Sequence, residues 1–204
     1  MKLKRYHIGD DGVQLISNAL QTNSTLTEIN LVGNKIHTTG ALFLSQSLTF
    51  NSTLTSLDLG DNLIGAYGVK LISQSLQSNS TLTYLNLEDN QIGDEGMEFL
   101  SQALKLNSSI NTLDLSSNRI GDKGSNSIGQ FLKRNSTLTQ LILINNNINS
   151  DGVNFITQSL QINFTLTNLV LWNNFIGNDG IKSISEMLKI NNKLNTLDLT
   201  SNQF

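Results

Sequence analysis

Residues 79–106 read NSTLTYLNLEDNQIGDEGMEFLSQALKL, and the pattern of this stretch returns every 28 residues along the chain. Each unit follows the form L-x-x-L-x-L-x-x-N-x-I-x-x-x-G, and no insertion or deletion interrupts the step. Met1 and Leu3 occupy the register of the paired leucines at the start, and Leu197, Leu199 and Asn202 continue the pattern at the end. A fixed period of this length is the sequence signature of a repeat solenoid.

Each unit predicts a short strand followed by a helix. The alternation of Leu85 and Leu87 marks a strand with one face inward, and Met97, Leu100 and Leu104 follow at helical spacing. Strands that are joined through helices lie parallel, with right-handed crossovers. Because strands lie ~4.8 Å apart and packed helices ~8–10 Å apart, the stack must bend with its helices outside. We therefore expect an α/β solenoid of horseshoe shape, with eight inner parallel strands and seven outer helices.

The repeat resembles the leucine-rich repeat family, in its ribonuclease-inhibitor-like class, over the whole chain. Segments such as LNLEDNQIGDEGMEFLSQAL (residues 85–104) are similar to the repeat arms of NOD-like receptors. The resemblance implies a single leucine-rich repeat domain over residues 1–204, with about seven units of 28 residues. Neither terminal unit carries the polar cap that a solenoid needs, so we expect the chain to be a segment of a longer array.

Composition narrows the classes of partner and compartment. A net charge of -3 with 14% charged residues gives no general attraction to nucleic acid or to an anionic membrane. The chain has no cysteine for disulfides. It has no apolar run after its basic N-terminus and no stretch near the ~20 apolar residues of a membrane span. We therefore expect a cytoplasmic protein that binds neither nucleic acid nor membrane.

One position of the repeat forms Asn-X-Ser/Thr triplets, the acceptor sequence for N-linked glycan. Asn191 stands at the same position without forming an acceptor, which favours a structural role for this asparagine. We expect it to end each helix in the left-handed conformation that Gly and Asn adopt readily. A glycosylated extracellular receptor fragment is the alternative, disfavoured by the missing signal peptide and cysteines. The six triplets begin at Asn23, Asn51, Asn79, Asn107, Asn135 and Asn163.

Two further columns of the repeat also favour structural roles. The asparagine after each strand, such as Asn90, can pair backbone groups that the departing chain leaves free, and the family resemblance implies the same internal ladder. The glycine column opens a loop, where we expect positive φ, and the Asp that often follows it is a good N-cap. That column contains Gly9, His37, Gly65, Gly93, Gly121, Asn149 and Gly177.

Catalytic, metal and cofactor sites find little support in the sequence. The chain has no cysteine, and its histidines are His7 and His37 alone. Zinc requires three or four ligands in fixed geometry, and no serine lies in a strained turn beside a base. We therefore expect no enzyme activity, no bound metal and no cofactor.

The positions that vary between units can face a partner, because the repeated positions hold the solenoid together. On the outward face of the strands, the early units carry carboxylates and a tyrosine, and the later units carry apolar side chains. The predicted acidic surface contains Asp58, Asp61, Glu88, Asp89 and Asp114, with Tyr84 nearby. The predicted apolar surface contains Ile142, Ile144, Val170 and Trp172, with Phe175 as an extension.

These surfaces predict a non-enzymatic scaffold that binds a protein partner on its concave sheet. The partner would present apolar groups to the later units and basic groups to the earlier ones. Two alternatives follow from the family resemblance: a GTPase-activating regulator of the RanGAP type, and the ligand-sensing arm of a NOD-like receptor. The sequence leaves the oligomeric state open.

Overall fold

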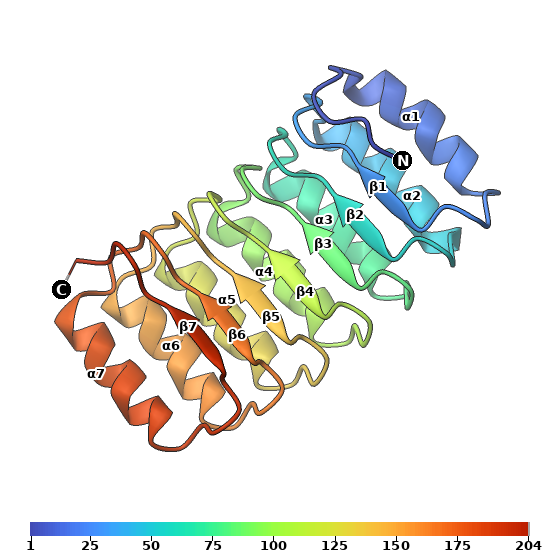
Figure 1. The fold of residues 1–204 in the computed structure, drawn as a ribbon. Coiled ribbons are helices and arrows are strands. Elements are labelled where there is room, and N and C mark those ends of the chain that lie inside the picture. Colours follow the sequence, from blue (N-terminus) through green and yellow to red (C-terminus); the bar gives the residue numbers. More distant parts are fainter. Residues whose placement is uncertain (204) are drawn as a thin grey trace.

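The computed structural model describes residues 1–203, in which helices and strands alternate strictly (Figure 1). The helices are α1 (Gly9–Leu20), α2 (Thr38–Phe50), α3 (Gly65–Leu76), α4 (Gly93–Leu104), α5 (Asp122–Leu132), α6 (Ser150–Leu160) and α7 (Gly177–Leu188). The strands are β1 (Glu28–Asn30), β2 (Ser56–Asp58), β3 (Tyr84–Asn86), β4 (Thr112–Asp114), β5 (Gln140–Ile142), β6 (Asn168–Val170) and β7 (Thr196–Asp198).

The strands form one parallel sheet in the order β1 to β7, and each helix packs against the next helix along the chain. Leu85 lies opposite Leu57 on one side and Leu113 on the other, so the register repeats the sequence period. Figure 1 shows the sheet on one face and the helices on the other. The predicted α/β solenoid with an inner parallel sheet and outer helices is confirmed.

The expected number of strands was wrong by one within the described residues. Lys2 forms a single bridge with Asn30 instead of a strand of its own. The Asn30 N–H donates to the Met1 carbonyl at 3.0 Å, and the Leu3 N–H donates to the Asn30 carbonyl at 2.9 Å. The ladder therefore reaches the first coil, but it pairs too few residues there to make an eighth strand.

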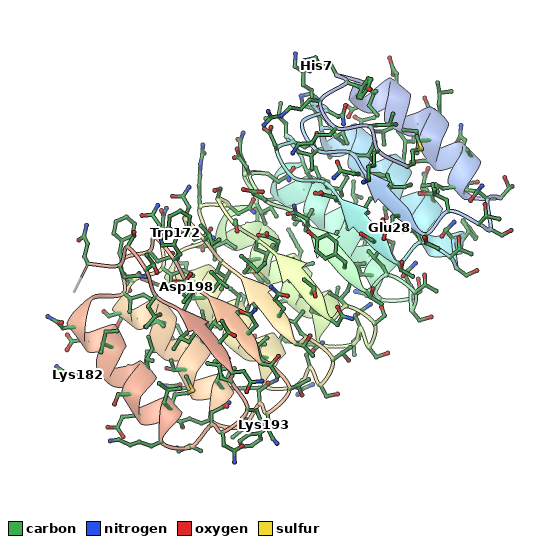
Figure 2. The ribbon with its side chains drawn as sticks, in the orientation of Figure 1. His7, Glu28, Trp172, Lys182, Lys193 and Asp198 are labelled. Carbon is green, nitrogen blue, oxygen red and sulfur yellow. The ribbon has the colours of Figure 1, made fainter. Side chains whose placement is uncertain are left out.

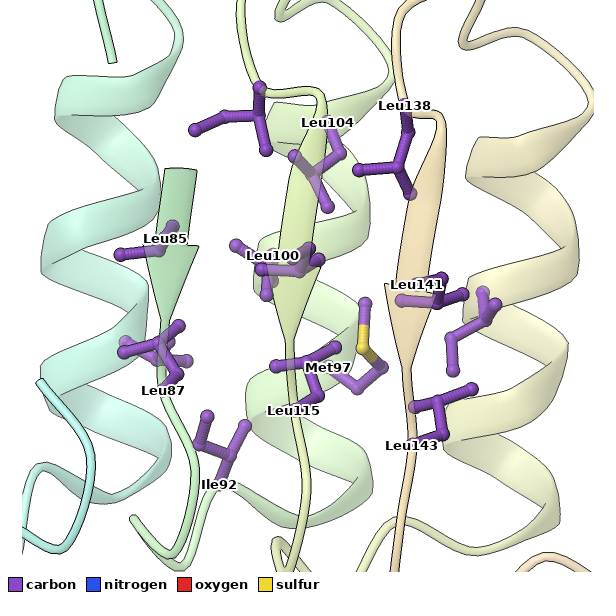
Figure 3. Close-up of a cluster of buried hydrophobic side chains, with 14 of the residues drawn as sticks. Leu85, Leu87, Ile92, Met97, Leu100, Leu104, Leu115, Leu138, Leu141 and Leu143 are labelled. Atoms are coloured by element: carbon purple, nitrogen blue, oxygen red, sulfur yellow. The ribbon is translucent and has the colours of Figure 1, made fainter. Parts of the chain in front are cut away.

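The core lies between the sheet and the helices and continues from α1 to α7. In Figure 3, Leu85 and Leu115 from the strand side face Met97, Leu100 and Leu104 from α4. All five of these side chains are fully buried. Burial of such side chains contributes about 1.5–3 kcal/mol each, so a regular set of them in every coil supplies the main stabilising term.

An asparagine ladder runs beside the core at the carboxyl ends of the strands. The Asn90 side-chain amide donates to the carbonyls of Leu59 and Glu88, both at 2.8 Å, and its backbone N–H donates to Asn118 Oδ1 at 3.0 Å. Its own Oδ1 accepts from the Ile64 N–H at 3.3 Å. Asn90 is fully buried. The expected internal ladder is confirmed.

The asparagines of the acceptor triplets form a second ladder at the other end of the strands. The Asn79 side-chain amide donates to the carbonyls of Leu48 at 2.8 Å and Asn51 at 3.2 Å. Its Oδ1 accepts from the backbone N–H groups of Thr81 and Leu82. This is an Asx-type turn. The structural role was expected, but the left-handed conformation was wrong, because Asn51 has φ -71° and ψ 126°.

The glycine column adopts two loop conformations. Positive φ was expected throughout, and it is confirmed at four of the seven positions, Gly9, Gly65, Gly93 and Gly177. The other three are extended, with φ of -105° at His37, -104° at Gly121 and -100° at Asn149.

An aspartate of the preceding coil selects the extended conformation. Asp94 Oδ1 accepts from the backbone N–H groups of Gly121 at 2.7 Å and Gly124 at 2.9 Å, at the start of α5. The expectation that Asp94 caps its own helix was wrong, since it caps the next one. The same bond joins His37 to Asp10 at 2.8 Å and Asn149 to Asp122 at 3.2 Å. Gly65, Gly93 and Gly177 keep positive φ. In the coil before each of them, the position of Asp94 is occupied by Thr38, Ala66 and Ser150, so no aspartate is present to accept the bond.

We expect Asn90→Ala to lower the free energy of unfolding by roughly 1–3 kcal/mol, because it leaves buried carbonyl and N–H groups without partners. Urea denaturation followed by circular dichroism measures the change. Asn126→Ala, on the exposed side of α5, is the control and should change stability little. Equal stability of the Asn90 variant and the wild type would show that the ladder is not required.

We expect Gly129→Ala to destabilise the fold by about 1–3 kcal/mol through overpacking, although alanine has the better helix propensity. A Cβ at Gly129 would lie 2.6 Å from the Phe155 carbonyl oxygen, so α5 and α6 would have to separate. Gln158→Ala, exposed on α6, is the control. A Gly129 variant as stable as this control would mean that the two helices do not need their close approach.

Candidate functional site

The outward positions of the strands form the concave face of the solenoid. Figure 2 labels Glu28 near the first strand and Trp172 and Asp198 near the last two strands. Backbone register places the middle residues of this face in one row across the sheet. That row reads Asn30, Asp58, Asn86, Asp114, Ile142, Val170 and Asp198.

The apolar patch consists of Ile142, Ile144, Val170 and Trp172. Ile142 lies directly opposite Val170 across β5 and β6. Ile144 and Trp172 follow two residues later on the same two coils. The three aliphatic side chains are half-buried, whereas Trp172 is 42% exposed. The structure thus brings the four predicted residues together.

Phe175 lies apart from the sheet, in the loop between β6 and α7. Its N–H donates to the Ile148 carbonyl at 2.8 Å, and its side chain is 52% exposed. Phe175 therefore lies on the loop rim of the concave face. It can extend the apolar patch toward that rim but does not belong to the outward rows of the sheet.

The acid zone consists of Asp58, Asp61, Glu88, Asp89 and Asp114. Asp58 lies in β2 and Asp114 in β4, and the other three lie in the turns after β2 and β3. Its carboxylates differ in how far they are already paired, which the sequence did not reveal.

Asp58 is held by its neighbours on the sheet. Its Oδ2 accepts from the Asn30 side-chain amide at 2.7 Å, and its Oδ1 accepts from the Asn86 side-chain amide at 2.9 Å. The Gly60 N–H also donates to Oδ1, at 3.3 Å. Both oxygens are therefore engaged. Asn30 and Asn86 stand two coils apart in the same row, on either side of Asp58. The alternation of Asn and Asp along that row is the sequence pattern from which this pairing could have been predicted.

The remaining carboxylates are more open. Asp61 pairs with Arg5 at 3.5 Å in an exposed contact, a type that contributes little. Asp114 Oδ1 accepts from the N–H and the hydroxyl of Ser116 at 2.9 and 2.6 Å. Among residues 1–203, no donor to the side-chain carboxylate of Glu88 or Asp89 is found. These two side chains, with the second oxygen of Asp114, are the groups free to meet a cation.

The carboxylates of the acid zone repel one another. Partial burial on the sheet raises the pKa of Glu88, and the charges of Asp114, Asp89, Asp58 and Asp61 raise it further. Burial likewise raises the pKa of Asp58, against the hydrogen bonds that stabilise its charge. The zone is therefore a negative surface that Arg5 and Lys4 offset only in part, and a basic group placed on it would relieve the remaining repulsion.

Tyr84 begins β3 beside this zone and is half-buried. Burial raises the pKa of its hydroxyl, and the charges of Asp58, Asp114 and Glu88 raise it further. The phenol therefore stays protonated and can donate a hydrogen bond. Tyr84 and Asp58 help to line a shallow hollow of about 120 Å³ at the first coils.

A second hollow lies at the loop rim rather than on the sheet. It measures about 290 Å³ and includes Asp61 and Asp89 with His7 and Lys35. The first hollow is well below the ~300–1,000 Å³ of clefts that hold small molecules, and the second is at their lower limit. Within the described chain, no group of three or more His, Cys, Asp or Glu side chains could hold a metal ion. No helix there is long and apolar enough to cross a membrane.

The repeat is matched directly by a family model described as Leucine Rich repeat. The matches cover residues 22–45, 50–73, 78–101, 106–128 and 134–156, together more than half of the chain. The chain therefore belongs to the leucine-rich repeat family. No curated protein matches the sequence.

Solved structures share the fold. "Leiomodin-1 Actin-Binding Site 2 (ABS2)" aligns with a TM-score of 0.60 and 28% identity, over 65% of this chain and 77% of that chain. The tropomodulin C-terminal domain of Caenorhabditis elegans aligns with a TM-score of 0.59 and 14% identity, over 65% and 82%. An internalin of Listeria monocytogenes aligns with a TM-score of 0.56 and 23% identity, over 91% of this chain and 50% of its own.

We expect Glu88→Gln to raise the melting temperature at pH 7. A carboxyl whose pKa is raised in the folded state costs stability when ionised. That cost disappears as the pH falls below the ordinary value of 4.5. The gain should therefore vanish near pH 4, as thermal melts followed by circular dichroism can show. Glu98→Gln, exposed on α4, serves as the control. A gain of equal size at both pH values would exclude charge repulsion as its cause.

Proposed function

We propose that the chain is a non-enzymatic interaction module that binds a protein partner on its concave face. The observation that carries the proposal is the apolar patch, where Trp172 is 42% exposed beside three branched side chains on adjacent coils. Single exposed apolar residues are ordinary on protein surfaces, but contiguous ones indicate contact sites. The solved leiomodin structure, whose title names an actin-binding site, supports a protein partner.

The apolar patch alone is too small for tight binding. Three of its four side chains are already half-buried, so covering the patch removes on the order of 200 Å² of apolar surface, roughly 5 kcal/mol at ~25 cal/mol/Å². Association costs an estimated 4–15 kcal/mol. The partner must therefore make further contacts, and the acid zone lies on the neighbouring coils.

The acid zone supplies charge complementarity. Glu88 and Asp89 are exposed, and their side-chain carboxylates accept no hydrogen bond from the described residues. A basic group of the partner would meet them without displacing an existing contact. Such complementarity adds mainly association rate and specificity, and salt screens it. Tyr84 can add a hydrogen bond, and Phe175 can extend the apolar contact at the loop rim.

The proposal places the module in the cytoplasm, as expected from the absence of cysteine. Neither a GTPase-activating activity nor a role as the sensing arm of a NOD-like receptor is favoured by a contact or a comparison described above. Binding without catalysis is the simpler role for this surface.

Actin is a second, more specific candidate. It rests on the 28% identity to leiomodin-1 over 65% of this chain. Co-sedimentation with filamentous actin and fluorescence titration of monomeric actin test the candidate directly. Actin that neither pellets with the chain nor responds to it would eliminate this partner and leave the general proposal in place.

We expect Trp172→Ala to weaken partner binding about thirtyfold or more, since truncating a central aromatic anchor commonly costs 2 kcal/mol or more. The melting temperature should stay nearly unchanged, because the side chain is on the surface. Affinity capture from lysate with the wild type, followed by titration of the captured protein, measures the effect.

Phe50→Ala is the matched control for this experiment. Phe50 is an exposed aromatic residue, 71% accessible, but it ends α2 on the opposite layer. Its truncation should leave the affinity unchanged. If the Trp172 variant binds the captured protein as tightly as the Phe50 variant does, the concave patch is not the site.

A further inference from the structure

The backbone of the concave sheet offers little to an incoming peptide strand. Between inner coils its N–H and carbonyl groups are paired with each other. The Leu87 N–H donates to the Asp114 backbone carbonyl and the Leu115 N–H to the Ile142 carbonyl, both at 2.9 Å. The Asp89 N–H donates to Ser116 at 2.9 Å. Strand addition needs a free edge, and the face of the sheet has none.

The side chains of the two outward rows offer few free donors. The Asn86 amide and the Ser116 hydroxyl are buried and are directed to Asp58 and Asp114. The second row stands two residues after the first and reads Val32, Gly60, Glu88, Ser116, Ile144, Trp172 and Thr200. Across β2 to β6 the two rows otherwise hold carboxylates, apolar groups and Gly60, so the Trp172 indole N–H is their remaining donor. The donors at the first strand residues, among them Tyr84, Gln140 and Asn168, lie two residues before the first of these rows and four before the second. An extended peptide that crosses the row of Glu88 and Trp172 would therefore leave most of its carbonyl groups there without partners, at about 1–3 kcal/mol each.

We propose that the partner docks as an α-helix that crosses the strands, with a cationic side chain on the acid zone and its apolar side chains on the apolar patch. This inference rests on the proposed function and specifies the partner for the same surface. A helix satisfies its own backbone hydrogen bonds, so it needs from this face only the charge and apolar contacts that the face supplies. The cation would meet Glu88 and Asp89, whose side-chain carboxylates are exposed and accept no hydrogen bond from the described residues.

Strand spacing fixes the sequence pattern of such a helix. Glu88 and Ile144 stand two coils apart, which is ~9.6 Å at ~4.8 Å per strand, and Trp172 lies one coil further at ~14.4 Å. At ~1.5 Å per residue, a side chain seven residues along lies ~10.5 Å away and one eleven residues along ~16.5 Å away. Both return to the same helical face. The pattern is therefore a basic residue at i with apolar residues at i+7 and i+11.

A designed peptide tests this pattern without knowledge of the natural partner. The probe is a blocked, fluorescein-labelled helix of about 20 residues, ~30 Å long, built on alanine and glutamine. It carries arginine at position 4, leucine at position 11 and phenylalanine at position 15. One control has proline at position 9, which breaks the helix. The other moves the two apolar residues to positions 13 and 17, on another face.

Fluorescence anisotropy should show the helical probe binding at least about tenfold more tightly than either control peptide. Trp172→Ala should weaken that binding about tenfold or more and Glu88→Lys should weaken it most at low salt, whereas Phe50→Ala should leave it unchanged. This set of results supports the helix.

Two outcomes overturn the inference. The proline peptide binding as tightly as the helix, with the same loss on Trp172→Ala, would show an extended ligand. No binding of the helical probe up to roughly 1 mM would show that this pattern does not fit the face. In both cases the proposed function is judged separately, by whether Trp172→Ala alone impairs binding of the protein captured from lysate.

Discussion

Each coil of this chain depends on two buried asparagine amides that tie it to the coil before it. The Asn90 amide reaches the Leu59 carbonyl and the Asn79 amide reaches the Leu48 carbonyl, each at 2.8 Å and each 31 residues back. The Leu59 carbonyl has just left the sheet, and the Leu48 carbonyl lies in the last turn of α2, so burial would leave both without a backbone partner. An amide that both donates and accepts solves this in one side chain. The spacing from donor to acceptor then admits no insertion, which explains the unbroken period of the sequence.

Since the asparagine ladders occupy repeated positions, a partner can be bound only by the positions that vary between units. The register places equivalent outward residues of successive units on neighbouring strands. The acid zone and the apolar patch therefore lie on adjacent parts of one face. Not every variable position is available to a partner. The position of Asp58 varies between units, yet the two carboxylate oxygens of Asp58 already accept hydrogen bonds from Asn30 and Asn86. Variation alone therefore does not identify a binding group, and the unpaired Glu88 is the better candidate.

The layout of the fold was predictable from the sequence because it depends on spacing within one unit. Leu85, Leu100 and the column of Asn90 take their predicted places. Predictions failed where contacts between units decide the outcome. Gly93 and Gly121 occupy the same column, but Asp94 accepts from Gly121 and draws it into the extended form. Likewise, only the assembled sheet reveals which carboxylates are paired and that Phe175 lies on the loop rim.

The reach of the asparagine bonds has a mechanical consequence. Every bond of the two ladders ends on the same coil or the adjacent one, so a force pulling the termini apart is carried by the coils in series. An end coil shares one interface with the rest, whereas an inner coil shares two. Under tension the array therefore unspools from its ends. Each released coil adds 28 residues of slack, roughly 90–100 Å of contour length.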